Sequence, residues 1–173
     1  LDISTDGAGN LLVLVVRSWP VTVGTVVKLS PSGVQTWSRT ITGAFVPRKL
    51  ASDAAGNSWV TGGAFGGIGL AGFTGAGAQS FAAWYPLTDF VNGVEIAAHP
   101  ATTTISLAAW DGWGNIALLT ATGGTGALTG SAWWDDATWR TVTAIAATGA
   151  GPDIYIVGSR GGVSQDVYLA RFS

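Results

Sequence analysis

The segment Ile3-Ser-Thr-Asp6-Gly-Ala-Gly9-Asn10 leads straight into the apolar stretch LLVLVVR at 11–17, and this arrangement decides the fold. A short apolar strand is followed by a small polar turn and by a second apolar strand. Gly and Asn tolerate the positive φ that a tight hairpin requires, and the Asp6 carboxylate can accept backbone hydrogen bonds across the turn. The segment therefore predicts a β-hairpin.

The same arrangement returns three times further along the chain. The later copies begin at Leu50, Ile96 and Ile145, so successive starts lie 47, 46 and 49 residues apart. Repetition at a fixed period is typical of repeat architectures. The third copy departs most, because His99-Pro100 and three threonines replace the Asp and the Gly-Asn pair. We expect its first hairpin to be reshaped.

Each repeat continues into a third apolar strand, and three repeats add an aromatic fourth strand. The third strands are predicted at 25–30, 70–75, 115–121 and 167–173, and the fourth strands carry Trp37, Phe81 with Trp84, and Trp133 with Trp134. Units of about 45 residues with four strands are typical of β-propeller blades. The sequence predicts an all-β propeller of about four four-stranded blades, in one domain with repeats near 1–48, 49–94, 95–143 and 144–173.

The ends of the chain bear on ring closure. The fourth repeat stops after its third strand at Ser173, so a closed ring needs more chain. We expect an arc of a larger propeller, or a ring that lacks its closing strand, and Leu1 as the first residue suggests a mature or trimmed piece. The near-continuous apolar runs at 11–16 and 153–157 predict strands covered on both faces by neighbouring blades.

Composition narrows the function classes. Charged residues are only 10% of the chain against about 25% in typical soluble domains, while Gly reaches 26 and Trp reaches 9. The eight basic residues are scattered and the net charge is -2, so nucleic acid is not an expected partner. No apolar run approaches the ~18 residues of a membrane span. The absence of Cys removes disulfides and thiolate metal sites.

Two segments resemble a known family. Asp53-Ala-Ala-Gly-Asn57 followed by Trp59-Val-Thr-Gly62, and the final stretch 154–173, resemble the SBBP-type and delta-60 repeats of bacterial surface and secreted proteins. The stretch 26–37 is similar to the segment that closes those repeats. The resemblance implies a propeller fold and a bacterial setting at the cell surface or outside the cell. It implies little about function, because the shared residues are turn and packing residues.

Catalytic motifs are weak throughout. Gly67-Ile-Gly69-Leu-Ala-Gly72 fits the dinucleotide fingerprint GxGxxG, but no amphipathic helix follows, so we expect a glycine-rich hairpin between the second and third strands. His99 is the only histidine and has no Cys or GxSxG serine around it, which favours a structural role. The sequence predicts a protein that is not an enzyme and that uses no cofactor and no metal.

The third repeat holds the candidate binding residues. Its members are Trp110, Trp113, Trp133, Trp134, Asp135, Asp136 and Trp139. Indole faces stack on sugars and are favoured at protein interfaces, while the Asp pair could bind calcium or sugar hydroxyls or simply form a solvated turn. The competing interpretation is that the large rings fill the wedge between blades, above all Trp37, Trp59 and Trp84.

The function predicted from these features is a non-enzymatic binding or structural module that contacts a protein partner or further blades. Two alternatives stay open. One is a lectin-like carbohydrate binder that uses the Trp-rich third repeat. The other is a fragment of a propeller hydrolase whose active site lies elsewhere, since glycosidase chemistry needs two placed carboxyl groups and the chain has a single Glu, Glu95.

Overall fold

The computed structural model describes residues 1–19, 21–64, 66–87, 91–100, 102–111, 113, 115–134, 140–148, 153–160 and 166–172. Regular structure in this part of the chain is entirely β, and no helix there is long and apolar enough to cross a membrane. The strands are β1 (Asp2–Thr5), β2 (Leu11–Arg17), β3 (Val23–Leu29), β4 (Gln35–Thr40), β5 (Val46–Ser52), β6 (Ser58–Ala64), β7 (Gly67–Phe73), β8 (Gln79–Pro86), β9 (Val91–Ala98), β10 (Thr104–Asp111), β11 (Ile116–Thr122), β12 (Leu128–Trp134), β13 (Arg140–Ala147), β14 (Ile154–Arg160) and β15 (Asp166–Phe172).

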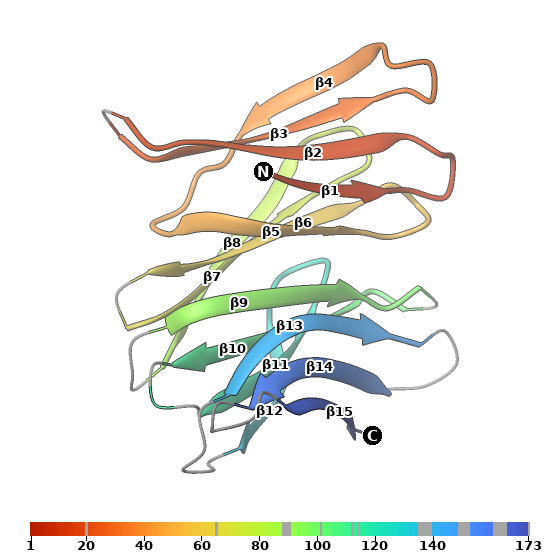
Figure 1. The fold of residues 1–173 in the computed structure, drawn as a ribbon. Coiled ribbons are helices and arrows are strands. Elements are labelled where there is room, and N and C mark those ends of the chain that lie inside the picture. Colours follow the sequence, from red (N-terminus) through yellow and green to blue (C-terminus); the bar gives the residue numbers. More distant parts are fainter. Residues whose placement is uncertain are drawn as a thin grey trace.

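The strands form four antiparallel sheets in chain order. β1–β4, β5–β8 and β9–β12 make blades 1 to 3, and β13–β15 make a three-stranded blade 4. The first strands lie next to one another, β1 beside β5, β5 beside β9 and β9 beside β13. Figure 1 shows the blades stacked as an open arc, with blades 1 and 4 at opposite ends. The predicted propeller arc is confirmed, and the sheets do not close into a ring.

The predicted hairpin turns are confirmed in detail. Asp6 Oδ1 accepts the Asn10 amide at 2.9 Å, and Asp53 Oδ1 accepts the Asn57 amide at 2.8 Å. Gly9 has φ +76° and Gly56 has φ +85°, the left-handed region that glycine adopts without strain.

The first hairpin of blade 3 is reshaped, as the third copy of the repeat predicted. The His99 amide donates to the Thr104 carbonyl at 3.0 Å, which closes a turn one residue longer than those of blades 1 and 2. The Asp-to-Asn turn occurs in blade 3 at a different place, between β10 and β11, where the Asn115 amide donates to Asp111 Oδ1 at 2.9 Å.

Apolar side chains between successive blades make the core. Every blade contributes aliphatic residues from its central strands to a layer shared with its neighbour. The layer between blades 1 and 2 contains Leu12, Leu14, Val26, Trp37, Leu50, Val60, Ala71 and Phe73. Because each layer needs both blades, a blade has no complete core of its own.

Two expectations were wrong. β2 and β14 are covered on one face only, since Leu12 and Leu14 are buried while Val15 is exposed, and Ile156 is buried while Val157 is exposed. The physical reason is that blades 1 and 4 each have a neighbour on one side only. The run 67–72 is also no hairpin, because it lies within the buried third strand β7.

Glycine at position 62 is required by close approach of another strand. β5 carries a bulge between Pro47 and Lys49, and this bulge brings the Val46 carbonyl against the place where a Cβ of residue 62 would stand. Backbone cannot move aside as a flexible side chain would.

We expect Gly62→Ala to lower the free energy of unfolding by about 2–3 kcal/mol, because the added methyl overpacks a rigid bulge. Gly124→Ala is the matched control, since a Cβ there meets nothing within 4 Å, and it should change stability by less than about 0.5 kcal/mol. Urea denaturation of both variants measures the difference. Equal effects of the two substitutions would show that the bulge does not constrain position 62.

A buried ion pair of blade 1 lies against the first turn of blade 2. Lys28 Nζ lies 2.8 Å from Asp6 Oδ2, and both groups pack against Gly56 in the first turn of blade 2. Burial alone would raise the pKa of Asp6. Hydrogen bonds from Lys28, Asn10 and Ala8 outweigh it and lower the pKa from 3.8 to about 2.

The Asp6 pKa predicts acid sensitivity with a defined sign. A lowered folded-state pKa gives stability that is present above about pH 4 and lost as the pH falls toward about 2. We expect Asp6→Asn to lose about 2 kcal/mol at neutral pH, with the gap to the parent chain closing near pH 2. Lys28→Met should reproduce this dependence in urea titrations. A gap that stays constant from neutral pH to about pH 2.5 would contradict the assignment.

Candidate functional site

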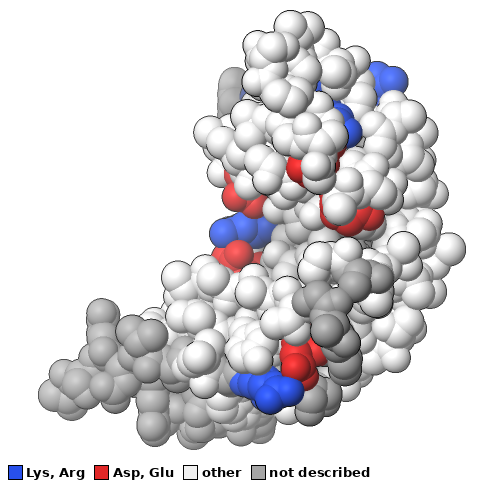
Figure 2. Space-filling view, turned by 90° about the vertical axis from the view of Figure 1, so that its right-hand side faces the viewer, with Lys and Arg blue, Asp and Glu red and all other residues white. Residues whose placement is uncertain are grey.

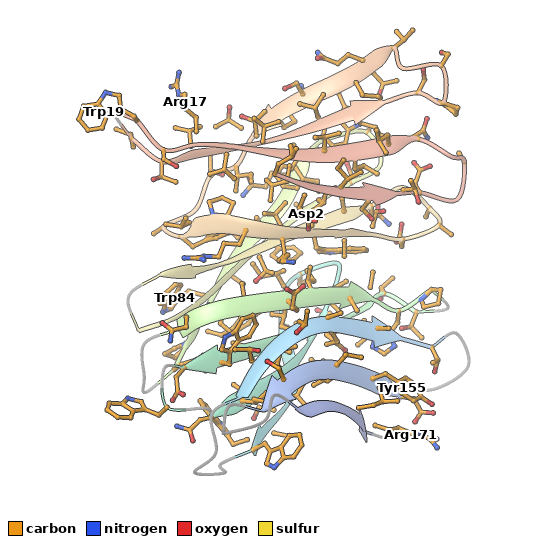
Figure 3. The ribbon with its side chains drawn as sticks, viewed as in Figure 1. Asp2, Arg17, Trp19, Trp84, Tyr155 and Arg171 are labelled. Carbon is orange, nitrogen blue, oxygen red and sulfur yellow. The ribbon has the colours of Figure 1, made fainter. Side chains whose placement is uncertain are left out.

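One end of the blades collects exposed tryptophans. In a four-stranded meander the second and fourth strands finish at the same end, and so do the loops that follow them. Trp19 and Trp113 lie in loops after β2 and β10, and Trp84 and Trp133 lie near the ends of β8 and β12. Figure 3 shows Trp19 and Trp84 projecting from the same side. The exposed fractions are 83% for Trp19, 42% for Trp84, 75% for Trp113 and 53% for Trp133. We call this the tryptophan end.

The tryptophans at the opposite end have a packing role. Trp37 and Trp59 are buried, and each donates its indole N–H to a turn of the next blade. Trp37 Nε1 reaches the Gly75 carbonyl at 3.2 Å, and Trp59 Nε1 reaches the Gly123 carbonyl at 2.8 Å. The wedge-filling interpretation is therefore confirmed for Trp37 and Trp59. It is wrong for Trp84, whose ring faces solvent at the other end.

The candidate residues of the third repeat divide into three groups. Trp113 and Trp133 are exposed at the tryptophan end. Trp110 and Trp134 are partly buried and pack against the layer between blades 3 and 4. Asp135, Asp136 and Trp139 lie outside the described residues. The sequence did not single out Trp19, and it assigned Trp84 to packing; only the meander brings their strand ends together with Trp113 and Trp133.

A small hollow lies among the predicted residues. It is lined by Leu87, Val91, Ala109, Trp110, Asp111, Asn115, Ala117 and Trp133, and it encloses about 10 Å³. That volume holds about one water molecule. Its polar groups already bind each other, since Asn115 Nδ2 donates to Asp111 Oδ2 at 2.6 Å. The hollow cannot admit a sugar ring, so any larger ligand must contact the indole faces from outside.

A larger hollow opens on the concave side at the same end. Its volume is about 390 Å³, and Trp110 lines it as well as the small hollow. The other lining residues are Leu1, Val16, Pro47, Arg48, Lys49, Asn92, Gly93, Val94 and Glu95. First strands of three blades supply most of this wall.

Charges of alternating sign cross the first strands. Asp2, Lys49 and Glu95 each stand one residue before the first aliphatic residue of their repeat, a signal that aligning the repeats would have revealed. Lys49 Nζ lies 2.8 Å from Glu95 Oε1, and Asp2 Oδ2 accepts the Leu50 amide at 2.7 Å. Figure 2 shows acidic and basic side chains alternating in the hollow of the molecule.

Burial governs the titration of Glu95. Its loss of water raises the pKa above 4.5, Lys49 opposes the rise, and the nearby Asp2 carboxylate adds to it.

Arg48 differs from the Lys49–Glu95 pair. It occupies the bulge of β5, is exposed, and has no ion-pair or hydrogen-bond partner within the described part of the chain. It is therefore a cation available to a ligand at the rim of the larger hollow.

His99, the remaining titratable residue that the sequence drew attention to, has a structural role. His99 is buried in the first turn of blade 3, and its Nε2 lies 2.8 Å from Ser106 Oγ, which is buried too. Among the described residues, no group of three or more His, Asp or Glu is placed to hold a metal ion. The arrangement at the tryptophan end can bind by apolar contact, stacking and a free guanidinium.

Comparison with known proteins shows the fold. No family model and no curated protein matches the chain. Among solved structures, the WD40 repeats of RRP9 superpose with a TM-score of 0.62 at 9% identity, over 96% of this chain and 50% of that one. The Dos1 propeller gives 0.59 at 10% identity, over 90% and 41%. Synechocystis apocarotenoid oxygenase gives 0.54 at 8% identity, over 98% and 50%.

These likenesses establish a β-propeller fold. They leave activity undecided, because the same fold carries WD40 repeats and an oxygenase. The chain spans about half the length of the structures that it matches. The finer resemblance to SBBP-type and delta-60 repeats stays a prediction.

We expect loss of Lys49 to lower the stability of the fold more than loss of Glu95. Lys49→Met leaves a buried carboxylate unpaired and should cost about 1 kcal/mol at neutral pH, a value reduced because Lys49 is partly exposed. Glu95→Gln should be close to neutral, because Lys49 can still reach water. Since the folded pKa of Glu95 is raised, stability falls as the pH rises through the range above 4.5, and Lys49→Met should steepen this fall.

Urea unfolding at about pH 4 and about pH 8 measures both effects. Arg48→Met is the matched control, because this neighbouring cation has no partner among the described residues and its loss should leave stability unchanged. A larger loss for Glu95→Gln than for Lys49→Met would contradict the asymmetry.

Proposed function

We propose that the chain is a non-enzymatic binding module that holds a protein partner at the tryptophan end. The single observation that carries the proposal is the separation of its tryptophans. Trp37 and Trp59 are buried at one end, while Trp19, Trp84, Trp113 and Trp133 face solvent at the other. Trp supplies a large share of binding energy at protein interfaces, because burying its ring removes much apolar area from water.

The larger hollow supports a protein as the partner. Arg48 offers a free guanidinium at its rim, and Trp110, Val16 and Pro47 supply apolar wall. A partner segment with an apolar anchor and a carboxylate fits this mixture, since Arg binds carboxylates with two parallel hydrogen bonds. The Lys49–Glu95 pair beside it is already satisfied and contributes polarity without a strong net charge.

The sugar-binding alternative has weaker support. Sugar sites are concave, and the hollow between Trp110 and Trp133 holds about one water molecule, while the larger hollow has Trp110 as its single aromatic lining residue. The proposal includes the absence of catalysis. It rests on the pairing of the carboxylate of Glu95, the single Glu, with Lys49. A setting at the cell surface or outside the cell rests on the repeat resemblance and stays a prediction.

A displayed random-peptide library, selected on the folded chain, provides the probe. We expect selected peptides to bind the parent chain and to lose at least about tenfold in affinity on Trp113→Ala and Trp133→Ala, because each truncation removes an exposed ring. Leu128→Ala is the matched control, since Leu128 is exposed on β12 with Trp133 but at the opposite end of the strand. Isothermal titration with one synthetic peptide measures the change.

The same variants separate the alternatives. Peptides that bind Trp113→Ala, Trp133→Ala and the parent chain equally would refute the tryptophan end as the site. A glycan array in which the parent chain binds a sugar and Trp113→Ala does not would replace the protein partner with a carbohydrate.

A further inference from the structure

The first strands of blades 2, 3 and 4 each contain a β-bulge. Each bulge inserts one unpaired residue, which is Arg48 in β5, Asn92 in β9 and Thr143 in β13. All three residues are polar and exposed. A bulge interrupts the ladder and re-aims a side chain, and bulges are frequent beside active sites. The repeated bulge therefore offers polar side chains along the first strands, where the concave side lies.

Two of the bulged residues line the larger hollow. Arg48 and Asn92 both lie in its wall, and neither side chain has a hydrogen-bond or ion-pair partner within the residues that the structure describes. A guanidinium carries five N–H donors, and a side-chain amide carries two. Blades 2 and 3 each have a neighbouring blade on both sides, so this pair of donors belongs to the interior of the arc.

The other charges near the hollow are already satisfied. Lys49 Nζ lies 2.8 Å from Glu95 Oε1, so these two charges offset each other. Asp2 Oδ2 accepts the Leu50 amide at 2.7 Å, and Asp2 does not line the hollow. Among the described residues of this wall, Arg48 is therefore the charge without a counter-ion, and its chemistry favours an anion.

Trp110 gives the hollow an apolar side next to these donors. Its indole lies against the backbone at Gly93, where a Cβ would meet the ring. Val16, Pro47 and Val94 extend the apolar wall. The volume of about 390 Å³ falls within the range of about 300–1,000 Å³ that is usual for ligand pockets. The hollow can therefore take a short segment that is apolar on one side and anionic on the other.

We propose that the larger hollow binds a peptide carboxylate that stands next to an apolar side chain. Arg48 binds the carboxylate through two parallel hydrogen bonds, the Asn92 amide adds a further donor, and the apolar side chain packs against Trp110. The carboxylate is that of a chain terminus or of an Asp or Glu side chain, since both present the same two oxygens. The inference rests on the proposed function for its carrier, because that function makes the ligand a protein.

Three short peptides test for recognition of a carboxylate. Acetyl-Gly-Phe-Leu carries a free terminal carboxylate, its C-terminal amide carries none, and acetyl-Asp-Phe-Leu amide carries one on a side chain. We expect at least one carboxylate peptide to bind the full chain with a Kd below about 1 mM, and the uncharged amide to bind at least about tenfold more weakly. NMR titrations of the backbone amides measure the affinities. Tighter binding of acetyl-Gly-Phe-Leu would identify a chain terminus as the natural ligand, and tighter binding of acetyl-Asp-Phe-Leu amide an internal acidic residue.

Substitution of Arg48 tests the donor. Arg48→Met should remove the difference between the carboxylate peptides and the uncharged amide, and Asn92→Ala should reduce this difference by a smaller factor, because it removes a neutral donor. Both residues are exposed, so neither change should unfold the chain, which circular dichroism checks. Arg39→Met is the matched control, since Arg39 is an exposed arginine on β4 outside the hollow, and it should keep the full difference.

Three results would overturn the proposal. The first is equal binding of the carboxylate peptides and the uncharged amide, or no binding by any of them up to about 10 mM. The second is a difference that survives Arg48→Met. The third is a difference that Arg39→Met removes as well, because net charge alone would then explain it.

Failure of this inference differs from failure of the proposed function. Library peptides that lose affinity on Trp113→Ala, with short peptides that bind Arg48→Met and the parent chain alike, would keep the tryptophan end and remove the carboxylate site. Short peptides that require Arg48, with library peptides that are indifferent to Trp113→Ala and Trp133→Ala, would keep the carboxylate site and remove the tryptophan end.

Discussion

Burial of aliphatic pairs between successive sheets is the interaction on which this structure depends. A four-stranded blade has two apolar faces, and neither can be hidden without a neighbouring blade, so stability comes from interfaces rather than from any blade alone. Polar contacts reinforce the same interfaces. The Asp6–Lys28 pair lies against Gly56, and the Trp59 indole donates to the Gly123 carbonyl of blade 3. These polar contacts stand at the rim of the layers in which the apolar faces meet.

The same constraint limits where binding can occur. Blade faces that meet a neighbouring blade are occupied by packing, and the end opposite the tryptophan end is filled by short loops and by the buried rings of Trp37 and Trp59. The tryptophan end and the concave side remain. Several exposed indoles gather there, Trp113 and Trp133 among them, and such a group needs more explanation than single apolar residues scattered on a surface. The proposed contact with a partner would supply it.

The fold could be predicted because local signals agree with it. β2 and β6 begin and end where turn residues and apolar runs place them. The start of β7 was misjudged because three glycines leave GIGLAG with few of the branched residues of a strand, yet a Cβ at Gly69 would meet the Phe45 ring, and one at Gly72 would meet Phe81. The third repeat is rich in tryptophan, and this made Trp113 and Trp133 candidate binding residues. Trp19 and Trp84 belong to other repeats, so only topology could add them to the site.

The chain alternates polar and apolar residues where a strand meets water. In β4 the Trp37 side chain is buried, while its polar neighbours Thr36 and Ser38 are exposed and half-buried. β2 has no such alternation, because Val13 and Val15 stand on its bare face as aliphatics. β14 is similar, with Tyr155 and Val157 on its bare face. Residues that had to face water permanently would follow the β4 pattern. The composition of β2 and β14 is therefore that of internal blades, which indicates faces suited to being covered.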